Sequence, residues 1–465
     1  MTADETANAP EGIKTLPLTG MKDYTFTMTV SALDCTGCGS CANVCPGKKG
    51  NKALEMAPLE ANTEEQKFFD YGVTLPQKED VIAKYKETTV KGSQFKQPLL
   101  EFSGACAGCG ETPYAKLITQ LFGDRMYIAN ATGCSSIWGN SSPSTPYTTN
   151  AKGQGPAWAN SLFEDNAEFG YGMLLAQRAI RDGLKAKVEA VVADGKDEAV
   201  KEAGQEWLDT FAVGATNGAA TDKLIAALEA CGCDAAKEIL AQKNYLSKKS
   251  QWIFGGDGWA YDIGFGGVDH VLASGRDINV MVFDTEVYSN TGGQSSKSTP
   301  TGAIAQFAAG GKETKKKDMA SIAMSYGYVY VAQISMGADF NQTVKAIAEA
   351  EAYPGPSLII AYAPCINHGI KKGMAKAQTE EELAVKCGYW HNFRFNPAAD
   401  KKFALDSKTP DMENYMDFLN GEVRYNSLQR QNPEKAARLF AKNESEAKAR
   451  YAYLNKLVAM YGEEE

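Results

Sequence analysis

The sequence predicts an α/β fold, a mostly parallel sheet with helices on both faces, preceded by a partial ferredoxin-like α+β domain. Two observations carry this prediction. Short apolar runs alternate with helical patterns in the second half of the chain, at 251–254, 279–283, 328–331 and 357–362. Such alternation is typical of strand–helix–strand units in a parallel sheet. Near the start, four cysteines lie within eleven residues, as in small iron–sulfur domains.

The first part of the chain predicts a small domain followed by a connector. Residues 24–30 alternate as a strand should, the cysteine run follows directly, and a second strand at 54–56 is expected to close the unit. We therefore expect the ferredoxin-like domain at residues 1–60. Residues 61–100 are interpreted as a linker that contains one charged helix near 81–87.

Residues 101–465 are expected to form one large domain. Helical periodicity covers 167–184, and the Ala-, Glu- and Lys-rich stretch 186–247 predicts a peripheral helical insertion. Further helices are expected at 261–274, 319–326, 341–352 and, as a charged amphipathic C-terminal helix, 433–461.

The composition disfavours several classes of protein. The 465 residues carry a net charge of −9, and no apolar run approaches the roughly 20 residues of a membrane span. The sequence has no stripe of basic and aromatic residues of the kind that binds nucleic acid. An odd count of 11 cysteines, with C-x-x-C spacing and no signal peptide, favours thiolates that bind metal in a reducing cytoplasm. The 3 histidines leave little room for histidine metal sites or an acid–base histidine pair. We therefore expect clusters and a cofactor to carry the chemistry.

The first cysteine run predicts a 4Fe–4S cluster. Cys35, Cys38, Cys41 and Cys45 stand in C-T-G-C-G-S-C-A-N-V-C-P, and small residues between them let the backbone turn back on itself. A zinc knuckle is the alternative, and it is disfavoured because zinc sites usually split into two separated pairs.

In two-cluster ferredoxins, the fourth cysteine of each run binds the cluster of the other run. The sequence holds no second run of this kind. Our hypothesis is that the partner run lies upstream of Met1 or on a separate polypeptide.

A possible diphosphate and magnesium site follows two of the predicted strands. Gly256-Asp257-Gly258 comes between a strand and a helix, where backbone N–H groups can hold phosphate. This motif alone is weak evidence for a diphosphate and magnesium site, because turns of this composition are common. The next strand ends at Asp284, followed by a loop that reaches N-T-G-G at 290–293, and its oxygens are expected to face Asp257. Magnesium prefers such hard oxygen ligands.

Five motifs together resemble the pyruvate:ferredoxin (flavodoxin) oxidoreductase family. They are G-D-G-W-A-Y-D-I-G-F-G-G-V-D-H, Y-S-N-T-G-G-Q-S-S-K-S-T-P, C-A-G-C-G-E-T-P-Y, A-T-G-C-S-S-I-W-G and Y-A-P-C-I-N-H-G-I. The resemblance covers nearly the whole chain, as the C-terminal portion of the long single-chain form. It implies a thiamine-diphosphate-binding fold.

Carried over by motif, the resemblance implies that Asp257, Thr285 and the main chain of Val287 bind Mg²⁺. It implies contacts with thiamine diphosphate from Glu111, Cys134, Gly256, Asp257, Gly258, Trp259, Thr285, Glu286, Val287, Tyr288, Ser289 and Asn290. Asn290 is also expected near the substrate, as a catalytic residue.

A second cluster needs two thiolates besides those of Cys106 and Cys109. The residues alone offer Cys134, Cys231, Cys233, Cys365 and Cys387. Loop-like surroundings favour Cys134 and Cys365, and the resemblance implies the same set, Cys106, Cys109, Cys134 and Cys365, for a proximal 4Fe–4S cluster. We interpret the remaining three cysteines as ordinary small residues and His368 as a structural hydrogen-bonding residue.

A local excess of lysine stands at Lys297, Lys312 and 315–317. A solvated face is the default interpretation. Docking of an acidic ferredoxin is the alternative.

The resemblance implies oxidative decarboxylation of pyruvate to acetyl-CoA and CO2, with electrons passing through 4Fe–4S clusters to ferredoxin or flavodoxin. The complete enzyme is expected to be a homodimer. No convincing candidate for the glutamate that activates the aminopyrimidine stands in this sequence, and the coenzyme A contacts belong to upstream domains of the family. We therefore expect the isolated chain to bind cofactor weakly and turn over negligibly. The alternatives are another 2-oxoacid:ferredoxin oxidoreductase and a non-catalytic iron–sulfur electron-transfer module.

Overall fold

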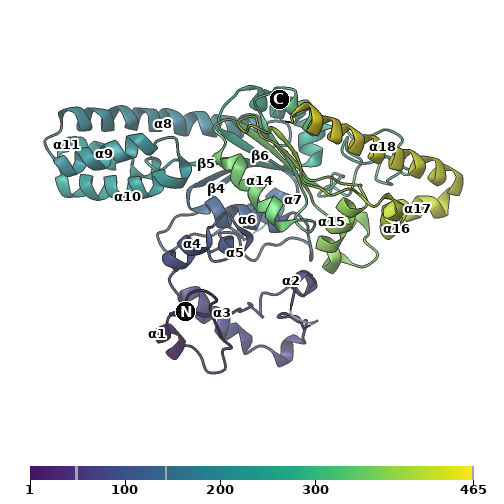
Figure 1. Ribbon diagram of the computed structural model, residues 1–465, viewed down its shortest axis with the longest axis horizontal. Coiled ribbons are helices and arrows are strands. Elements are labelled where there is room, and N and C mark those ends of the chain that lie inside the picture. Colours follow the sequence, from purple (N-terminus) through teal and green to yellow (C-terminus); the bar gives the residue numbers. More distant parts are fainter. Residues whose placement is uncertain (48–50, 142–143, 463–465) are drawn as a thin grey trace.

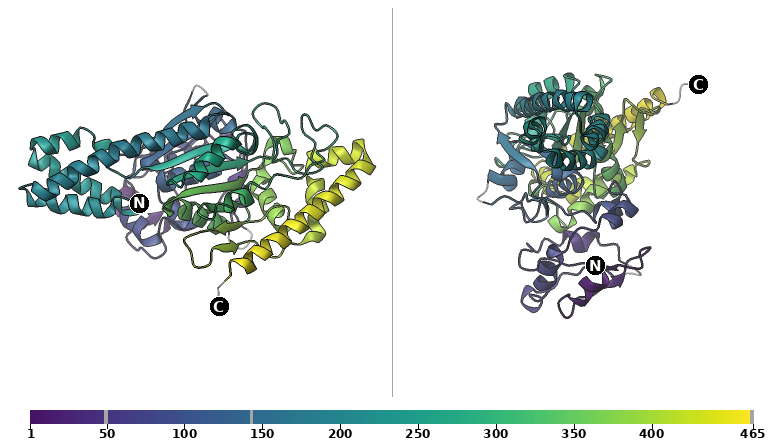
Figure 2. Two further views of the ribbon diagram at one scale, coloured as in Figure 1. Left: turned by 90° about the horizontal axis from the view of Figure 1, so that it is seen from above. Right: turned by 90° about the vertical axis from the view of Figure 1, so that its left-hand side faces the viewer.

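The computed structural model describes residues 1–47, 51–141 and 144–462. A central twisted sheet is covered by helices, a helical bundle extends from one end, and the N-terminal segment lies beneath the body (Figures 1 and 2). The predicted α/β class is confirmed.

The main sheet has eight strands in the order β10-β9-β7-β8-β6-β5-β3-β4. Its strands are β3 (Met126–Ala131), β4 (Ala157–Ser161), β5 (Ser250–Gly256), β6 (Ile278–Asp284), β7 (Tyr330–Ile334), β8 (Pro356–Tyr362), β9 (Phe393–Phe395) and β10 (Phe403–Leu405). Neighbours from β7 to β4 pair parallel, while β9 and β10 pair antiparallel at one edge. The mostly parallel sheet is therefore as predicted. Sequence reasoning missed β3, β4, β9 and β10.

Both faces of the sheet are buried, because successive residues of a strand point to opposite sides. In β6, Val280 and Val282 enter one core while Met281 and Phe283 enter the other. The first core includes residues from α8 (Asn166–Asp194), α12 (Phe265–Ala273) and α13 (Met319–Met324). The second includes residues from α6 (Thr112–Phe122) and α14 (Phe340–Ala352). This double burial explains the continuous apolar runs in the sequence.

The predicted insertion at 186–247 is helical. The outer part of α8 packs with α9 (Glu198–Thr210), α10 (Gly214–Cys231) and α11 (Asp234–Leu240) around a separate core that includes Trp207 (Figure 1). Buried Arg181 fastens this bundle by donating to the carbonyl of Leu246 and the side-chain oxygen of Asn217.

The C-terminal helices pack on the face of the sheet that borders the first core. They extend along the side opposite the insertion (Figure 2). They are α15 (Ala377–Lys386), α16 (Tyr415–Gly421), α17 (Val423–Gln431) and α18 (Pro433–Met460). Short helical turns connect the elements of this domain: η2 (Gly123–Arg125), α7 (Cys134–Ser136), η3 (Ile137–Ser141), η4 (Lys243–Tyr245), η5 (Gly258–Ile263), η6 (Ile366–His368), η7 (Met374–Lys376) and η8 (Met412–Asn414).

The N-terminal segment differs most from expectation. Its elements are α1 (Ala3–Ala7), β1 (Leu16–Pro17), β2 (Thr25–Phe26), α2 (Ser40–Val44), η1 (Leu59–Ala61), α3 (Glu65–Thr74), α4 (Glu79–Tyr85) and α5 (Val90–Ser93). The predicted strand at 24–30 is wrong beyond Phe26, and 54–56 forms no strand. Met28 and Val30 are 55% and 41% exposed, so their alternation has no core to face. Within the described residues, no helix is both long enough and apolar enough to span a bilayer.

Candidate functional site

Four neighbouring strands bring the predicted site segments to one edge of the sheet. Cys365 follows β8, Asp284 ends β6, Asp257 follows β5, and Cys134 follows β3. These strands lie side by side in the order β8-β6-β5-β3 and run parallel, so their carboxyl ends meet. Ligands of open α/β sheets bind at this edge.

Asp257 is fully buried at the centre of this edge. Its Oδ1 accepts hydrogen bonds from the main-chain N of Thr285 at 3.2 Å and from the Thr285 hydroxyl at 3.0 Å, while Oδ2 accepts from Ser296 at 2.6 Å. Burial, and next the charge of Asp284, raise the pKa of Asp257 well above its usual value. A carboxylate here needs a positive partner to stay ionised.

Oxygens crowd around the Thr285 hydroxyl. Its Oγ1 lies 3.0 Å from Asp257 Oδ1, 3.0 Å from the carbonyl of Val287 and 3.3 Å from Ser289 Oγ. One hydroxyl proton can satisfy only one of these acceptors. The residues predicted to hold magnesium thus present a set of hard oxygens that fits a small divalent cation.

Asp284 is a second buried carboxylate that sequence reasoning did not assign to the site. Its Oδ1 accepts from Ser298 at 2.5 Å, and its Oδ2 accepts from Tyr261 and pairs with Lys316, both at 2.9 Å. Ser296 and Ser298, in the hydroxyl-rich S-S-K-S-T-P segment, donate to Asp257 and Asp284. This hydroxyl-rich segment was the signal in the sequence for a second buried carboxylate at the site.

The side chain of Glu286 is held in an ionic network. Glu286 has φ of 62°, which is uncommon for a residue with a side chain. Its carboxylate pairs with Lys316 at 2.9 Å and Arg424 at 2.8 Å and accepts from Tyr389 at 2.6 Å. Burial alone would raise the pKa of Glu286, but Lys316 and Arg424 outweigh it and lower the pKa to about 2.

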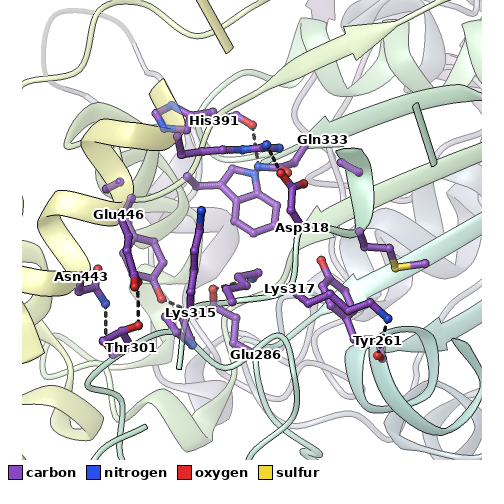
Figure 3. Close-up of a pocket in the computed structure, with 18 of the residues that line it drawn as sticks. Tyr261, Glu286, Thr301, Lys315, Lys317, Asp318, Gln333, His391, Asn443 and Glu446 are labelled. Atoms are coloured by element: carbon purple, nitrogen blue, oxygen red, sulfur yellow. Dashed lines mark hydrogen bonds and ion pairs between the residues drawn. The ribbon is translucent and has the colours of Figure 1, made fainter. Parts of the chain in front are cut away.

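A cavity of about 120 Å³ lies beside this network (Figure 3). Tyr261 of η5 and Glu286 of the loop after β6 line it on one side, and Asn443 and Glu446 of α18 line it on the other. The Glu286 side chain therefore serves to join the loop to the C-terminal helices.

The glycines near Asp257 differ in what they allow. A Cβ at Gly258 would lie 2.5 Å from the Tyr288 ring, so close packing requires glycine there. The buried ring of Trp259 similarly lies against Gly255 and Gly264, where added Cβ atoms would lie 2.3 Å from it. A Cβ at Gly256 would meet its nearest atom at 3.9 Å, so protein packing does not require that glycine.

Ser289 and Asn290 extend the loop toward the surface, and Asn290 is exposed. The thiol of Cys134 lies 3.4 Å from the hydroxyl of Ser289. This contact joins the predicted cofactor loop to the predicted cluster.

The four predicted proximal cysteines lie near one another. Gly110 N donates to the carbonyl of Pro364 at 3.0 Å, which ties the Cys106–Cys109 loop to the loop that carries Cys365. Burial, then the neighbouring charges of Glu111, Cys365 and Cys106, raise the pKa of the Cys134 thiol to about 12. Burial likewise raises the pKa of Cys365 to about 11, with Glu111 and Cys106 adding to it. A bound metal centre would offset this cost of burial, because thiol ligands lose their protons when they bind a metal.

No group of three or more His, Cys, Asp or Glu side chains in the described part of the chain is placed to hold a single metal ion. A cubane places its thiolates on separate irons, so it needs a wider spacing than one ion does. Among the other cysteines, Cys387 is buried in the C-terminal core, while Cys231 and Cys233 lie in the insertion.

Glu111 is buried beside the proximal cysteines. Its Oε2 accepts from the Trp138 indole at 2.8 Å, and burial raises the pKa of Glu111 to about 7. His368, expected to be structural, is fully buried, and both of its ring nitrogens make hydrogen bonds to the main chain.

The first cysteine run lies against the large domain. Gly37 and Gly39 have positive φ, 69° and 74°, and turn the backbone between cysteines. Cys45 Sγ accepts from Ala53 N at 3.2 Å. Helix α2 lies below α15 (Figure 1), and the side chain of Asn43 in α2 donates to Thr379 of α15 at 2.8 Å.

Most of the lysine cluster is used internally, so its interpretation as a solvated face is wrong for three members. Lys312 donates to the carbonyls of Ser296 and Thr299, Lys317 donates to that of Tyr261, and Lys316 pairs with acids. These lysines hold in place the loops that follow β5 and β6.

Comparison with known proteins gives one family match and several close relatives. The family model "Thiamine pyrophosphate enzyme, C-terminal TPP binding domain" matches residues 212–361, which include β5, β6, β7 and β8 up to Ala361. The chain is 54% identical over 98% of its length to the pyruvate-flavodoxin oxidoreductase of Klebsiella pneumoniae. It is 56% identical over 97% of its length to the pyruvate:ferredoxin oxidoreductase of Moorella thermoacetica. It is 49% identical over 94% of its length to the mitochondrial NADP(+) pyruvate dehydrogenase of Euglena gracilis.

The resemblance expected from the motifs is confirmed by these similarities. The chain spans 39% of the length of the first two relatives and 24% of the third. It is therefore similar, over nearly all of its own length, to a portion of these oxidoreductases.

Proposed function

We propose that this chain is the thiamine-diphosphate and proximal-cluster part of a pyruvate:ferredoxin or pyruvate:flavodoxin oxidoreductase, acting in the cytoplasm as part of a homodimer with upstream domains. The observation that carries the proposal is the 3.4 Å contact between Cys134 and Ser289. This contact joins a set of oxygens suited to bind Mg²⁺ to a group of four thiols. A thiamine site next to an iron–sulfur cluster suits one-electron oxidation of a 2-oxoacid.

Asp257, Thr285 and the main-chain carbonyl of Val287 would hold Mg²⁺ and, through it, the diphosphate of the cofactor. Gly256 supports this role, because the space beside it is not required by protein packing. When bound, thiamine diphosphate supplies the carbanion chemistry that decarboxylates a 2-oxoacid. The loop from Glu286 to Asn290 would orient the cofactor, with exposed Asn290 toward the substrate.

Cys106, Cys109, Cys134 and Cys365 would hold the proximal 4Fe–4S cluster, and Glu111 and Trp138 would shield it and the cofactor from water. Cys35, Cys38, Cys41 and Cys45 would bind iron in a pair of clusters beyond the proximal one. The other ligands of this pair would lie outside this chain. The docking of α2 against α15 supports an electron route from the proximal cluster to these thiolates.

The electron acceptor is the least constrained part of the proposal. The names of three similar enzymes specify flavodoxin, ferredoxin and NADP(+) as acceptors. All three are similar to this chain over almost its whole length, so features outside the shared portion are expected to choose the acceptor. Pyruvate is proposed as the substrate on the same similarity, and coenzyme A is proposed as the acetyl acceptor on the resemblance of the motifs to the family.

Calorimetric titration of the chain with thiamine diphosphate, with and without Mg²⁺, tests the proposal. We expect weak, magnesium-dependent binding that Asp257→Asn abolishes, since the amide is a neutral ligand without the negative charge that attracts the cation. Asp182→Asn, at an exposed position of α8, is the matched control and should bind like the wild type. Equal binding by Asp257→Asn would refute the site.

Two outcomes would favour the alternatives. A chain that holds iron but does not bind thiamine diphosphate would favour a non-catalytic electron-transfer module. In an assembly with the upstream domains, turnover of branched or aryl 2-oxoacids in preference to pyruvate would favour a different 2-oxoacid oxidoreductase.

A further inference from the structure

A pair of cysteines lies at the outer end of the helical insertion, outside the proposed site. Cys231 is the last residue of α10 and Cys233 immediately precedes α11. Their Sγ atoms are 2.8 Å apart. The sequence interpretation of these residues as ordinary small residues did not anticipate this contact.

The backbone of Gly232 creates the contact. It has φ of 59°, the left-handed conformation that favours glycine, and beyond its two chain neighbours no atom lies within 4 Å of where its Cβ would be. The left-handed turn ends α10 and directs the flanking side chains to the same side. The sequence C-G-C at a helix end therefore produces adjacent thiols.

The pair is accessible and separate from the proposed clusters. Cys233 is exposed and Cys231 is partly exposed. They flank the turn from α10 to α11, and this turn lies at the end of the bundle that extends away from the sheet (Figure 1). The thiol of Cys231 donates toward Cys233, which lowers the pKa of Cys233, while the same interaction raises the pKa of Cys231.

The two thiols alone are a poor metal site. No third His, Cys, Asp or Glu side chain in the described ranges completes a metal-binding group with them. Structural sites for thiophilic metals such as zinc use four ligands. Redox chemistry therefore suits the pair better than coordination.

We propose that Cys231 and Cys233 are a reversible dithiol–disulfide pair that exchanges with low-molecular-weight disulfides such as glutathione disulfide. The Cys233 thiolate attacks a sulfur of the glutathione disulfide, which forms a mixed disulfide and releases one glutathione thiolate. The Cys231 thiol then loses its proton and attacks Cys233 Sγ, which releases the second glutathione. The protein loses two electrons and two protons in total, and one glutathione disulfide becomes two glutathiones.

A disulfide between Cys231 and Cys233 would close a ring with a single intervening residue. Such a short ring removes little entropy from the unfolded chain. The pair is thus a modification site rather than a brace for the fold. Leu228 and Ile239, on the helices that the turn connects, lie in the core of the insertion, so oxidation would fix the turn without opening this core.

Mass spectrometry after equilibration in glutathione buffers tests the proposal on the full chain with its clusters intact. The cleavage sites of trypsin after Lys223 and Lys237 place both cysteines in the peptide 224–237, which has no other cysteine. After a denaturing quench with an alkylating reagent, reduced protein should give this peptide with two alkyl groups. Oxidised protein should give it unalkylated and lighter by two hydrogens.

Two comparisons sharpen the result. Cys233→Ser should leave Cys231 with no partner, so the peptide should carry one glutathione in place of the internal disulfide. Cys387, buried and alone in the tryptic peptide 387–394, should stay reduced throughout. Its behaviour controls for general oxidation or unfolding.

A peptide 224–237 that remains doubly alkylated in the most oxidising buffer would overturn the proposal. Two glutathione adducts on one peptide, or a disulfide to another cysteine, would also overturn it. The wild-type titration decides the matter even if the variant fails to fold. Iron content measured on the same samples should stay constant while the disulfide forms.

Discussion

The imidazole of His368 donates a hydrogen bond from Nε2 to the main-chain carbonyl of Thr285, with 2.7 Å between the two atoms. The carbonyl can only accept, so Nε2 carries the proton. The other ring nitrogen, Nδ1, then accepts from the main-chain N of Cys365 at 3.5 Å. A single buried ring thus links the loop of a proposed cluster ligand to the loop of a proposed magnesium ligand.

We expect His368→Leu to weaken magnesium-dependent binding of thiamine diphosphate, because the buried carbonyl of Thr285 would lose its donor. An unsatisfied buried group costs about 1–3 kcal/mol, or roughly 5- to 150-fold in Kd. His368→Gln, whose amide can donate in place of Nε2, should recover much of the affinity. Calorimetry measures both.

His270→Leu, at an exposed position of α12, is the control for loss of a histidine. If His368→Leu binds as tightly as wild type, the ring does not hold the loop. If glutamine is as weak as leucine, packing of the ring matters more than its hydrogen bond.

Cys365→Ser should remove the proximal cluster, because a hydroxyl is a poor replacement for a thiolate ligand of iron. Iron and acid-labile sulfide, measured after anaerobic reconstitution, should fall by the content of one cluster. Cys387→Ser changes a buried thiol of the C-terminal core and should leave both contents unchanged. Full iron content in Cys365→Ser would remove this residue from the proposed ligand set.

Arg424→Lys should destabilise the fold while retaining the charge. The guanidinium bridges two buried carboxylates, with 2.6 Å from Nε to Glu422 and 2.8 Å from Nη2 to Glu286. An ammonium cannot reproduce this forked geometry, and breaking buried pairs costs about 3–5 kcal/mol. We expect a loss of about 2–5 kcal/mol in urea unfolding. Arg430→Lys, on the exposed side of α17, should stay within about 0.5 kcal/mol of wild type.

The contribution of Glu381 to the stability of the fold should decrease as the pH rises from about 5 to about 8. Burial raises the pKa of Glu381 to about 8, above the 4.5 of the unfolded chain. Between these values the folded state retains a proton that the unfolded state has lost, so a higher pH favours unfolding. Oε2 lies 3.1 Å from Tyr114 OH, which in turn can donate to the carbonyl of Tyr362.

Urea midpoints at a series of pH values measure this contribution. Glu381→Gln removes the titrating group, so its midpoint should fall less than that of wild type over the same range. Glu382→Gln changes the neighbouring residue, whose side chain is 42% exposed, and should follow the wild-type curve. Parallel curves for wild type and Glu381→Gln would contradict the assignment.

The sequence determined the strands of the sheet centre, because residues buried on both faces must be continuously apolar. It missed β3, where Met126 to Ala131 includes Asn130, and β4, whose polar residues Asn160 and Ser161 do not form an apolar run. At the N-terminus, alternation at 24–30 predicted a strand, but pairing needs a partner and a core, which the sequence pattern cannot supply.

For the site, the residue types and their spacing by themselves indicated hard oxygen ligands after two strands and thiolates in four loops. Tertiary structure decided which of these meet, because the strand order sets which loops share the carboxyl edge. It also decided the roles of Asp284, Lys316 and Arg424, whose importance comes from burial beside other charges. The contact of Cys231 with Cys233 depended on one left-handed glycine, a backbone angle that the spacing of two cysteines does not specify.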